Sequence, residues 1–95
     1  MELFEIKARC IQLVRELDRC PSFRAWFELD EELGIYSDVH KELYGVRCSL
    51  GSIFDFVEEN ASSEFSRAFA RLARASFEAD PSAYRQLRLK TMSAE

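Results

Sequence analysis

The chain has few of the residues that punctuate β-structure: of its 95 residues, three are glycine and two are proline. A β-sandwich or barrel needs a turn signal roughly every eight to twelve residues, and such signals are missing here. The glycines stand apart at positions 34, 45 and 51, so the sequence contains no glycine-rich phosphate loop. No apolar run approaches the roughly 20 residues that a membrane-spanning helix needs. We therefore expect an all-α protein with no membrane association.

Metal ligands and nucleophiles are also scarce. The one histidine is His40, and the three cysteines are Cys10, Cys20 and Cys48. An odd number of irregularly spaced cysteines, without an apolar signal segment, indicates a reducing, cytoplasmic setting. His40 and Cys48 lack the context of a nucleophile motif, and Cys20, His40 and Cys48 lack the paired spacing of zinc ligands. We expect no catalytic residue, no metal and no cofactor, and therefore no enzyme.

What the sequence does contain is apolar surface. Hydrophobic residues make up 47% of the chain, and eight of them are phenylalanine. That content can form a packed core without disulfides or metals, and the length suits one domain. We predict a single domain over residues 1–95, folded as a compact bundle of four to six helices, with residues 91–95 frayed.

Apolar spacing of three and four predicts a first helix over 2–19, which ends before Pro21. Ser22 can cap a second helix from about Phe23 to Leu33, with Gly34 just past its end. Ser37 is the next candidate cap, for a two-turn helix that Gly45 ends. Tyr36, Val39, Leu43 and Tyr44 are its expected inward or interface side chains.

The second half of the chain begins its helices at recognisable caps. Ser52 with Asp55 resembles a capping box. Residues 53–78 then form either one long helix or two helices interrupted near 60–63. Asp80–Pro81 starts the last helix, which runs to about Lys90. The possibility of one long helix rests on apolar residues that keep helical spacing throughout the segment: Phe54, Val57, Ala61, Phe65, Ala68 and Leu72.

Charge is distributed unevenly, although the net charge is only −4. Acidic residues crowd the middle of the chain, and arginines dominate its last third. Two arginine stripes could bind phosphates, which gives a DNA-binding regulator as one alternative; they consist of Arg67, Arg71 and Arg74, with Arg85 and Arg88. The net negative charge favours a solvated face, or ion pairs with this chain's own acids, so nucleic acid is the less favoured partner.

Protein binding is the favoured alternative. Aromatic residues and arginine are enriched at interface hot spots, and an acidic segment would approach a basic surface quickly. The predicted partner-binding residues are Trp26, Glu28, Asp30, Glu31, Glu32, Tyr36, Asp38, Lys41, Glu42 and Arg47. A third alternative is a homo-oligomeric structural or assembly protein.

The segment Tyr36-Ser37-Asp38-x-x-Lys41-x-x-Tyr44-Gly45-x-Arg47 resembles a motif of small, mostly helical accessory proteins of phages and related mobile elements. In those proteins the arginine is usually followed by Pro-Arg, whereas this chain has Cys48-Ser49. The resemblance implies a mobile-element gene acting in a bacterial cytoplasm, and no particular reaction. Together with the residue pattern it predicts a non-enzymatic inhibitor or modulator of a host protein complex, of the anti-defence type.

Overall fold

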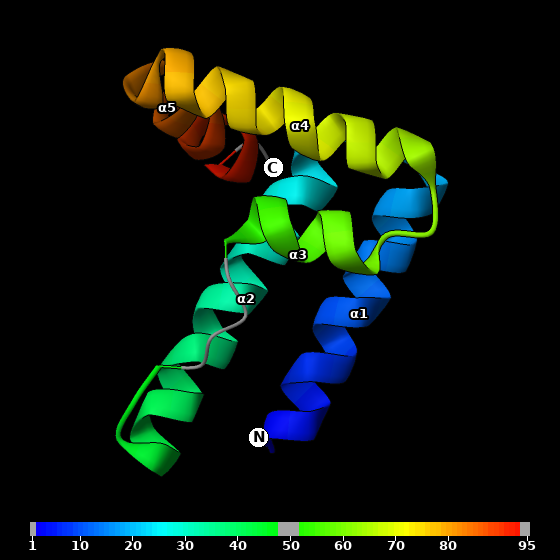
Figure 1. Ribbon diagram of the computed structural model, residues 1–95. Helices are drawn as coiled ribbons and strands as arrows, with labels where there is room; N and C mark the ends of the chain where they lie inside the picture. The colour runs from blue at the N-terminus through cyan, green and yellow to red at the C-terminus, as the bar shows by residue number, and fades with distance from the viewer. Residues whose placement is uncertain (1, 48–51, 94–95) are drawn as a thin grey trace.

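A computed structural model describes residues 2–47 and 52–93, and within these ranges the chain forms five α-helices and no strand (Figure 1). The protein is a single compact all-α domain, as predicted. No helix among these residues is long and apolar enough to cross a membrane. The helices are α1 (Leu3–Arg19), α2 (Phe23–Tyr44), α3 (Ile53–Asn60), α4 (Glu64–Ala79) and α5 (Pro81–Ser93).

Helices α1 and α2 form an antiparallel hairpin, the most extensive contact between any two helices described (Figure 1). Its seam follows the three-and-four spacing of α1, where the buried residues are Ile6, Cys10, Leu13, Val14 and Leu17. Helix α2 has 22 residues and α1 has 17. At about 1.5 Å per residue, α2 is longer by about 7.5 Å, so its last turn has little of α1 to pack against.

The other three helices cover only one end of this hairpin, the end where α1 connects to α2 (Figure 1). An aromatic core fills the junction. Trp26 is fully buried, and its indole Nε1–H donates a hydrogen bond of 2.8 Å to the hydroxyl of Tyr84 on α5. Its ring lies 5.5 Å from that of Phe69 on α4 and 5.7 Å from that of Phe54 on α3. One side chain of α2 therefore ties together all of the covering helices.

Helix α2 corrects two sequence predictions, because it runs unbroken from Phe23 to Tyr44. Ser22 caps it as expected and accepts a hydrogen bond from the Ala25 N–H. Gly34 was predicted to end this helix, and Ser37 to start another; both predictions are wrong. A glycine inside a helix costs only about 1 kcal/mol, less than the packing that flanking Leu33 gains against the core. Gly45 does end α2, in the left-handed conformation with φ 80°.

Residues 53–78 form two helices rather than one. Ser52 caps α3 as predicted, and Ser63 caps α4 by accepting from the Phe65 N–H. The break resets the helical phase, so the apolar spacing that suggests one long helix does not continue on one buried face beyond Ala61. Phe65 is 79% exposed and Leu72 is 61% exposed, while the small residues Ser66, Ala70 and Ala73 face the core instead.

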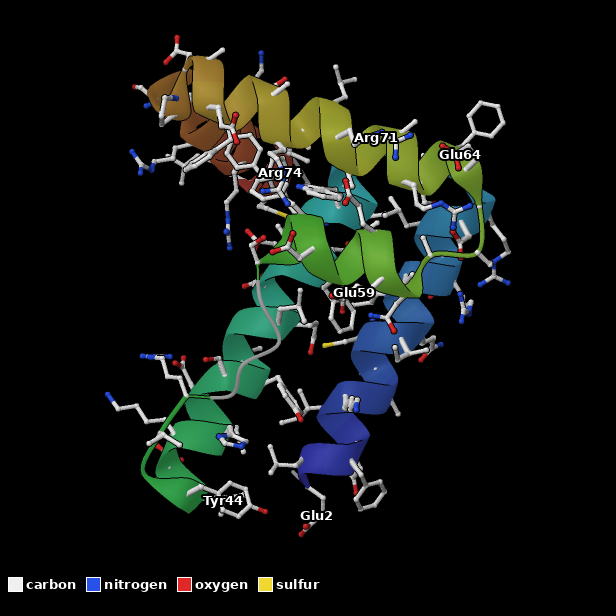
Figure 2. All side chains as sticks on the ribbon, viewed as in Figure 1. Glu2, Tyr44, Glu59, Glu64, Arg71 and Arg74 are labelled. Atoms are coloured by element: carbon white, nitrogen blue, oxygen red, sulfur yellow. The ribbon has the colours of Figure 1, made fainter. Side chains whose placement is uncertain are left out.

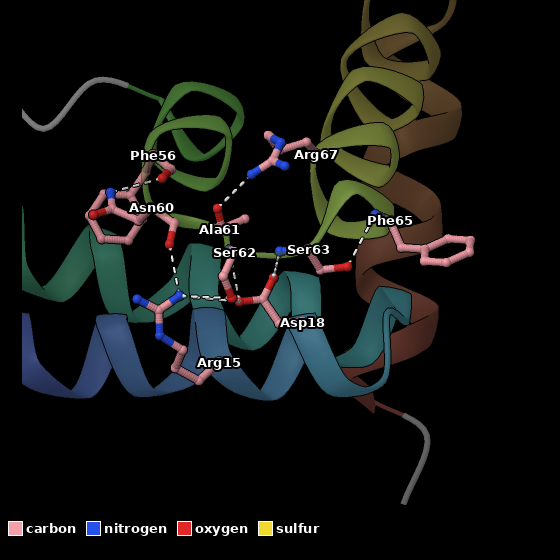
Figure 3. A network of polar contacts seen from close by, with 9 residues as sticks. All are labelled: Arg15, Asp18, Phe56, Asn60, Ala61, Ser62, Ser63, Phe65 and Arg67. Carbon is pink, nitrogen blue, oxygen red and sulfur yellow. Dashed lines mark hydrogen bonds and ion pairs between the residues drawn. The ribbon is translucent and has the colours of Figure 1, made fainter.

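The break between α3 and α4 is held by the Asp18 clasp, which we define as Asp18 with the groups bound to its carboxylate (Figure 3). This carboxylate, in the last turn of α1, accepts hydrogen bonds from the backbone N–H groups of Ser62 and Ser63, both 3.1 Å long. The Ser62 hydroxyl donates another, at 2.9 Å, and Arg15 pairs with the same carboxylate. Arg15 also reaches the Asn60 carbonyl, at 2.9 Å. The clasp thus satisfies the N–H groups that precede α4.

The clasp changes the acidity of Asp18. Burial of the carboxyl acts to raise its pKa, but the hydrogen bonds from Ser62 and Ser63 outweigh burial and bring the pKa to about 2. Its side chain is only 9% exposed. The ionised form is therefore the one that stabilises this corner of the fold.

The last helix begins at Asp80–Pro81 as predicted, and the Asp80 carboxylate accepts from the Ala83 N–H. It extends to Ser93, three residues past the predicted end at Lys90, and so includes residues expected to fray. The predicted connector 46–51 and the frayed end fall in part on residues 48–51 and 94–95, which lie outside the described residues.

Candidate functional site

The uncovered end of the α1–α2 hairpin exposes a cluster of large apolar side chains. We call it the hairpin tip and define it by Leu43, Tyr44 and Val46, which are 60%, 64% and 62% exposed. Phe4, in the first turn of α1 at the same end of the antiparallel hairpin, is 71% exposed. Figure 2 shows Tyr44 at this end, near Glu2 and far from α4. The tip is apolar surface that none of the described residues covers.

Local contacts hold the hairpin tip in shape. The Gly45 N–H donates to the Lys41 carbonyl at 2.8 Å, and its left-handed conformation turns the chain back along α2. His40 Nδ1 lies 2.7 Å from the Val46 carbonyl, a contact in which Nδ1 carries the proton and donates. The His40 ring packs against that of Tyr44, with centroids 4.8 Å apart. The single histidine therefore acts as a brace for the apolar cluster.

The charged residues of the predicted motif lie next to this cluster. Arg47, which follows the end of α2, forms an ion pair with Asp38 in the second-last turn of that helix. The Arg47 guanidinium also lies 3.4 Å from the Ser37 hydroxyl. Lys41 and Glu42 are both exposed. The tip thus combines aromatic and aliphatic surface with a rim of both charges, which is the composition of many protein interfaces.

One of the predicted partner-binding residues, Trp26, belongs to the interior, and the prediction is wrong for it. Trp26 has no exposed surface, because it is the centre of the aromatic core. Asp30 is partly buried and pairs with Arg88 at 2.5 Å. Burial raises the pKa of Asp30; Arg88 opposes that effect and Glu31 adds to it. Both side chains contribute to packing α2 against α5.

The remaining predicted residues are distributed along α2. Glu31, Asp38, Lys41, Glu42 and Arg47 are exposed, whereas Glu28, Glu32 and Tyr36 are half-buried. Glu28 accepts from Arg24 at 3.1 Å, and Tyr36 packs against the core. Asp38, Lys41 and Glu42 lie in the last two turns of α2, and Arg47 follows its cap, so the structure places these four residues beside the exposed apolar cluster. Glu31 lies farther back along α2, beside Arg88 and Leu89 of α5.

The arginines of the DNA-binding alternative are mostly engaged within the chain (Figure 2). Arg67 and Arg71 both bind Glu64, at 3.2 and 2.7 Å, and these hydrogen bonds lower the pKa of that carboxyl. Arg74 pairs with Asp55 at 2.6 Å and stacks over the Phe54 ring at 5.1 Å.

Arg88 likewise binds Asp30, and Arg85 is exposed on α5. Four of the five candidate phosphate ligands therefore already contact a carboxylate. An arginine held in this way contributes less to phosphate binding, because the ion pair has to be broken or shared.

A hollow of about 360 Å³ lies between α2 and the three covering helices. Leu33, Ile53, Phe54, Phe77 and Tyr84 form its apolar walls, and Gly34 leaves space on the α2 side. The carboxylate in its lining is Asp30, already bound to Arg88. Burial raises the pKa of the Tyr84 hydroxyl, against the opposing hydrogen bond from Trp26.

The candidate metal ligands do not converge in the described residues. Cys20 follows α1 at the covered end of the hairpin, whereas His40 lies near the hairpin tip, about 25 Å of helix away. Within residues 2–47 and 52–93, no three histidine, cysteine or acidic side chains are grouped so that they could hold a metal ion. Cys48, the other predicted ligand and nucleophile, lies outside the described residues.

Exposure of the hairpin tip was only partly foreseeable. The sequence predicts Leu43 and Tyr44 as inward or interface residues, and it predicts Val46 in a connector. The signal that could have decided it is helix length, since an unbroken α2 extends past α1.

Comparisons of this chain with protein families, with curated proteins and with solved structures find no match.

Proposed function

We propose that the protein is a non-enzymatic protein-binding factor that contacts its partner through the hairpin tip. The observation that carries the proposal is the exposure of Leu43, Tyr44 and Val46 in a locally braced segment. Contiguous apolar side chains on a small protein commonly mark an interaction surface. A rigid patch also loses little conformational entropy when it binds.

The net charge of the chain, rather than the balanced charges beside the tip, favours a partner with a basic surface. Glu31, Asp38 and Glu42 are exposed along the same helix, and the whole chain carries a net charge of −4. Such a field increases the rate of encounter with a cationic surface. The ion pairs that occupy Arg67, Arg71, Arg74 and Arg88 weigh against a DNA partner.

The motif over residues 36–47 contributes the biological setting of the proposal. Its resemblance to mobile-element accessory proteins supports a host protein complex as the partner, and inhibition or modulation as the effect. Most of the motif residues have local structural roles in α2 and its cap, and the exposed ones surround the hairpin tip.

Affinity capture from an extract of the source organism tests this proposal. Wild-type protein should retain a specific partner, and Leu43→Ser with Tyr44→Ser should lose at least tenfold of it. Leu89→Ser on α5 is the matched control, because Leu89 is 63% exposed and lies away from the tip. Equal capture by the tip variant and by the control would contradict the proposal.

A gel-shift titration with duplex DNA distinguishes protein binding from the main alternative, a DNA-binding regulator. We expect no band shift at physiological salt. Tight binding that weakens steeply with salt, and that Arg67→Ala and Arg71→Ala reduce, would replace protein binding with DNA binding as the function.

A further inference from the structure

The outer face of α4 carries an apolar stripe that the fold leaves uncovered. We define the α4 stripe as Phe65, Ala68, Leu72, Ala75 and Ala79, all exposed and spaced by three and four residues. Among the described residues, Phe65 is the most exposed of the large apolar side chains. The stripe lies opposite the face that buries Ser66, Ala70 and Ala73.

Helix α4 lies along one edge of the molecule, with α3 and α5 packed on its inner side (Figure 1). Figure 3 shows Phe65 pointing away from the other helices at the start of α4. Among the described residues, none packs over the α4 stripe. Another helix could therefore approach its whole length, which is about 24 Å for 16 residues.

The order of large and small residues identifies what fits against the stripe. If a second α4 lies antiparallel, offset so that Ala68 meets Leu72, then Phe65 meets Ala75 in the next layer. By symmetry the same two contacts recur on the other side of the twofold axis. All four layers then place one large side chain against one alanine, which is how two helices interdigitate at close range.

We propose that the α4 stripe is the interface of a homodimer, formed with a second copy of this chain in antiparallel orientation. The contact is isologous, as in most two-chain oligomers. It lies at the opposite end of the molecule from the hairpin tip, so a dimer would present two tips.

The same antiparallel register determines which charged side chains of the two copies face each other. Along one edge of the stripe lie Glu64, Arg71 and Glu78, spaced by seven residues. In the antiparallel pair, Glu64 approaches Glu78 of the second copy, and Arg71 approaches Arg71. Pairing of Arg71 with Glu64 inside each copy, at 2.7 Å, reduces this repulsion. The two Glu64–Glu78 contacts remain unfavourable, and they limit the affinity.

Sedimentation equilibrium of the full chain over a range of concentrations tests the proposal. Wild type should move from one-chain to two-chain mass as concentration rises. Leu72→Glu should remain at one-chain mass, because it places a charge in the central layers. Ala68→Leu should weaken the dimer at least tenfold by opposing leucine to leucine, although it adds apolar surface to the stripe.

The most specific variant is Glu78→Lys. It converts the two repulsive contacts with Glu64 of the second copy into attractive ones, and it should lower the dissociation constant of the dimer several-fold. Glu59→Lys on α3 and Ala8→Leu on α1 are matched controls at exposed positions, and should leave the dissociation constant unchanged. Circular dichroism checks that each variant is folded. One-chain mass for wild type at all concentrations, or a dimer insensitive to Leu72→Glu, would overturn the proposal. Neither result bears on partner capture by the hairpin tip.

Discussion

The two ends of the α1–α2 hairpin use the same kinds of residue for different purposes. At the covered end, aromatic rings are buried around Trp26, and the charge of Asp18 is enclosed by N–H and O–H donors. At the hairpin tip, Tyr44 and Leu43 face solvent, and the Asp38–Arg47 pair is exposed. Covering helices, rather than residue type, decide which end stabilises the fold. The uncovered end is left available for recognition.

The largest effect should come from removing the centre of the covered end. We expect Trp26→Ala to lower the free energy of unfolding by about 3–5 kcal/mol, since it leaves a cavity and strands the Tyr84 hydroxyl. This is a large part of the roughly 5–14 kcal/mol expected for a 95-residue domain. Urea unfolding followed by circular dichroism measures it, because the substitution removes the only tryptophan.

Trp26→Phe is the control that keeps an aromatic ring but loses the hydrogen bond, and it should cost about 1–2 kcal/mol. A loss below 1 kcal/mol for Trp26→Ala would show that the covered end is not the stabilising one.

The two aspartates should differ in how their charge affects stability. The pKa of Asp18 is about 2 in the folded protein, lower than the 3.8 of an ordinary aspartate. The corresponding stabilisation, about 2 kcal/mol, is fully present above pH 4–5 and is lost as the pH falls toward 2. Asp18→Asn should therefore flatten the acid limb of a plot of unfolding free energy against pH.

Asp38→Asn at the tip is the matched variant. Its ion pair with Arg47 is exposed, so we expect less than about 1 kcal/mol of change at neutral pH. An acid limb that Asp38→Asn flattens as much as Asp18→Asn would remove the distinction between the two ends.

Gly34 inside α2 and Gly45 at its C-terminal cap should respond oppositely to substitution by alanine, with smaller effects on stability. Apart from the backbone of its own helical turns and its chain neighbours, nothing lies within 4 Å of the position that a Cβ on Gly34 would occupy, and its backbone is helical. Gly34→Ala should raise the free energy of unfolding by about 0.5–1 kcal/mol. Gly45→Ala should lower it by about 1–2 kcal/mol, because φ is +80° there. Thermal unfolding of both variants checks the opposite signs.

The smallest effect on stability should come from the hairpin tip itself. Leu43→Ser and Tyr44→Ser should each change the free energy of unfolding by less than about 0.5 kcal/mol, because both side chains are more than half exposed. Chemical denaturation of the double variant measures this. A loss above 1.5 kcal/mol would mean that the tip is part of the fold rather than a recognition surface.

Local chemistry explains which parts of the fold were predictable. The caps at Ser22, Ser52 and Gly45 and the start at Asp80–Pro81 depend on neighbouring residues alone, and all are confirmed. The continuity of α2 through Gly34 depends on packing against other helices, which no local pattern encodes. The orientation of Phe65 and Leu72 depends on the phase reset at the break, and so on the Asp18 clasp.

The candidate site shows the same division. Exposed charges of the motif were identified from sequence, because short polar helical segments usually face solvent. The prediction for Trp26 is wrong, since its burial depends on α5, which lies more than 50 residues away in sequence. Arg74 pairs with Asp55 and Arg88 pairs with Asp30 only because folding brings different helices together. Arg67 and Arg71 pair with Glu64 within α4, so helical spacing alone brings them close.

Site-specific photo-crosslinking is the most direct test of the central claim, that the hairpin tip is the recognition surface. A photoreactive phenylalanine analogue at Tyr44 should give a discrete adduct with one partner in cells of the source organism. The same analogue at Glu59, exposed on α3 at the covered end, should give none. An adduct at Glu59 and none at Tyr44 would contradict the account.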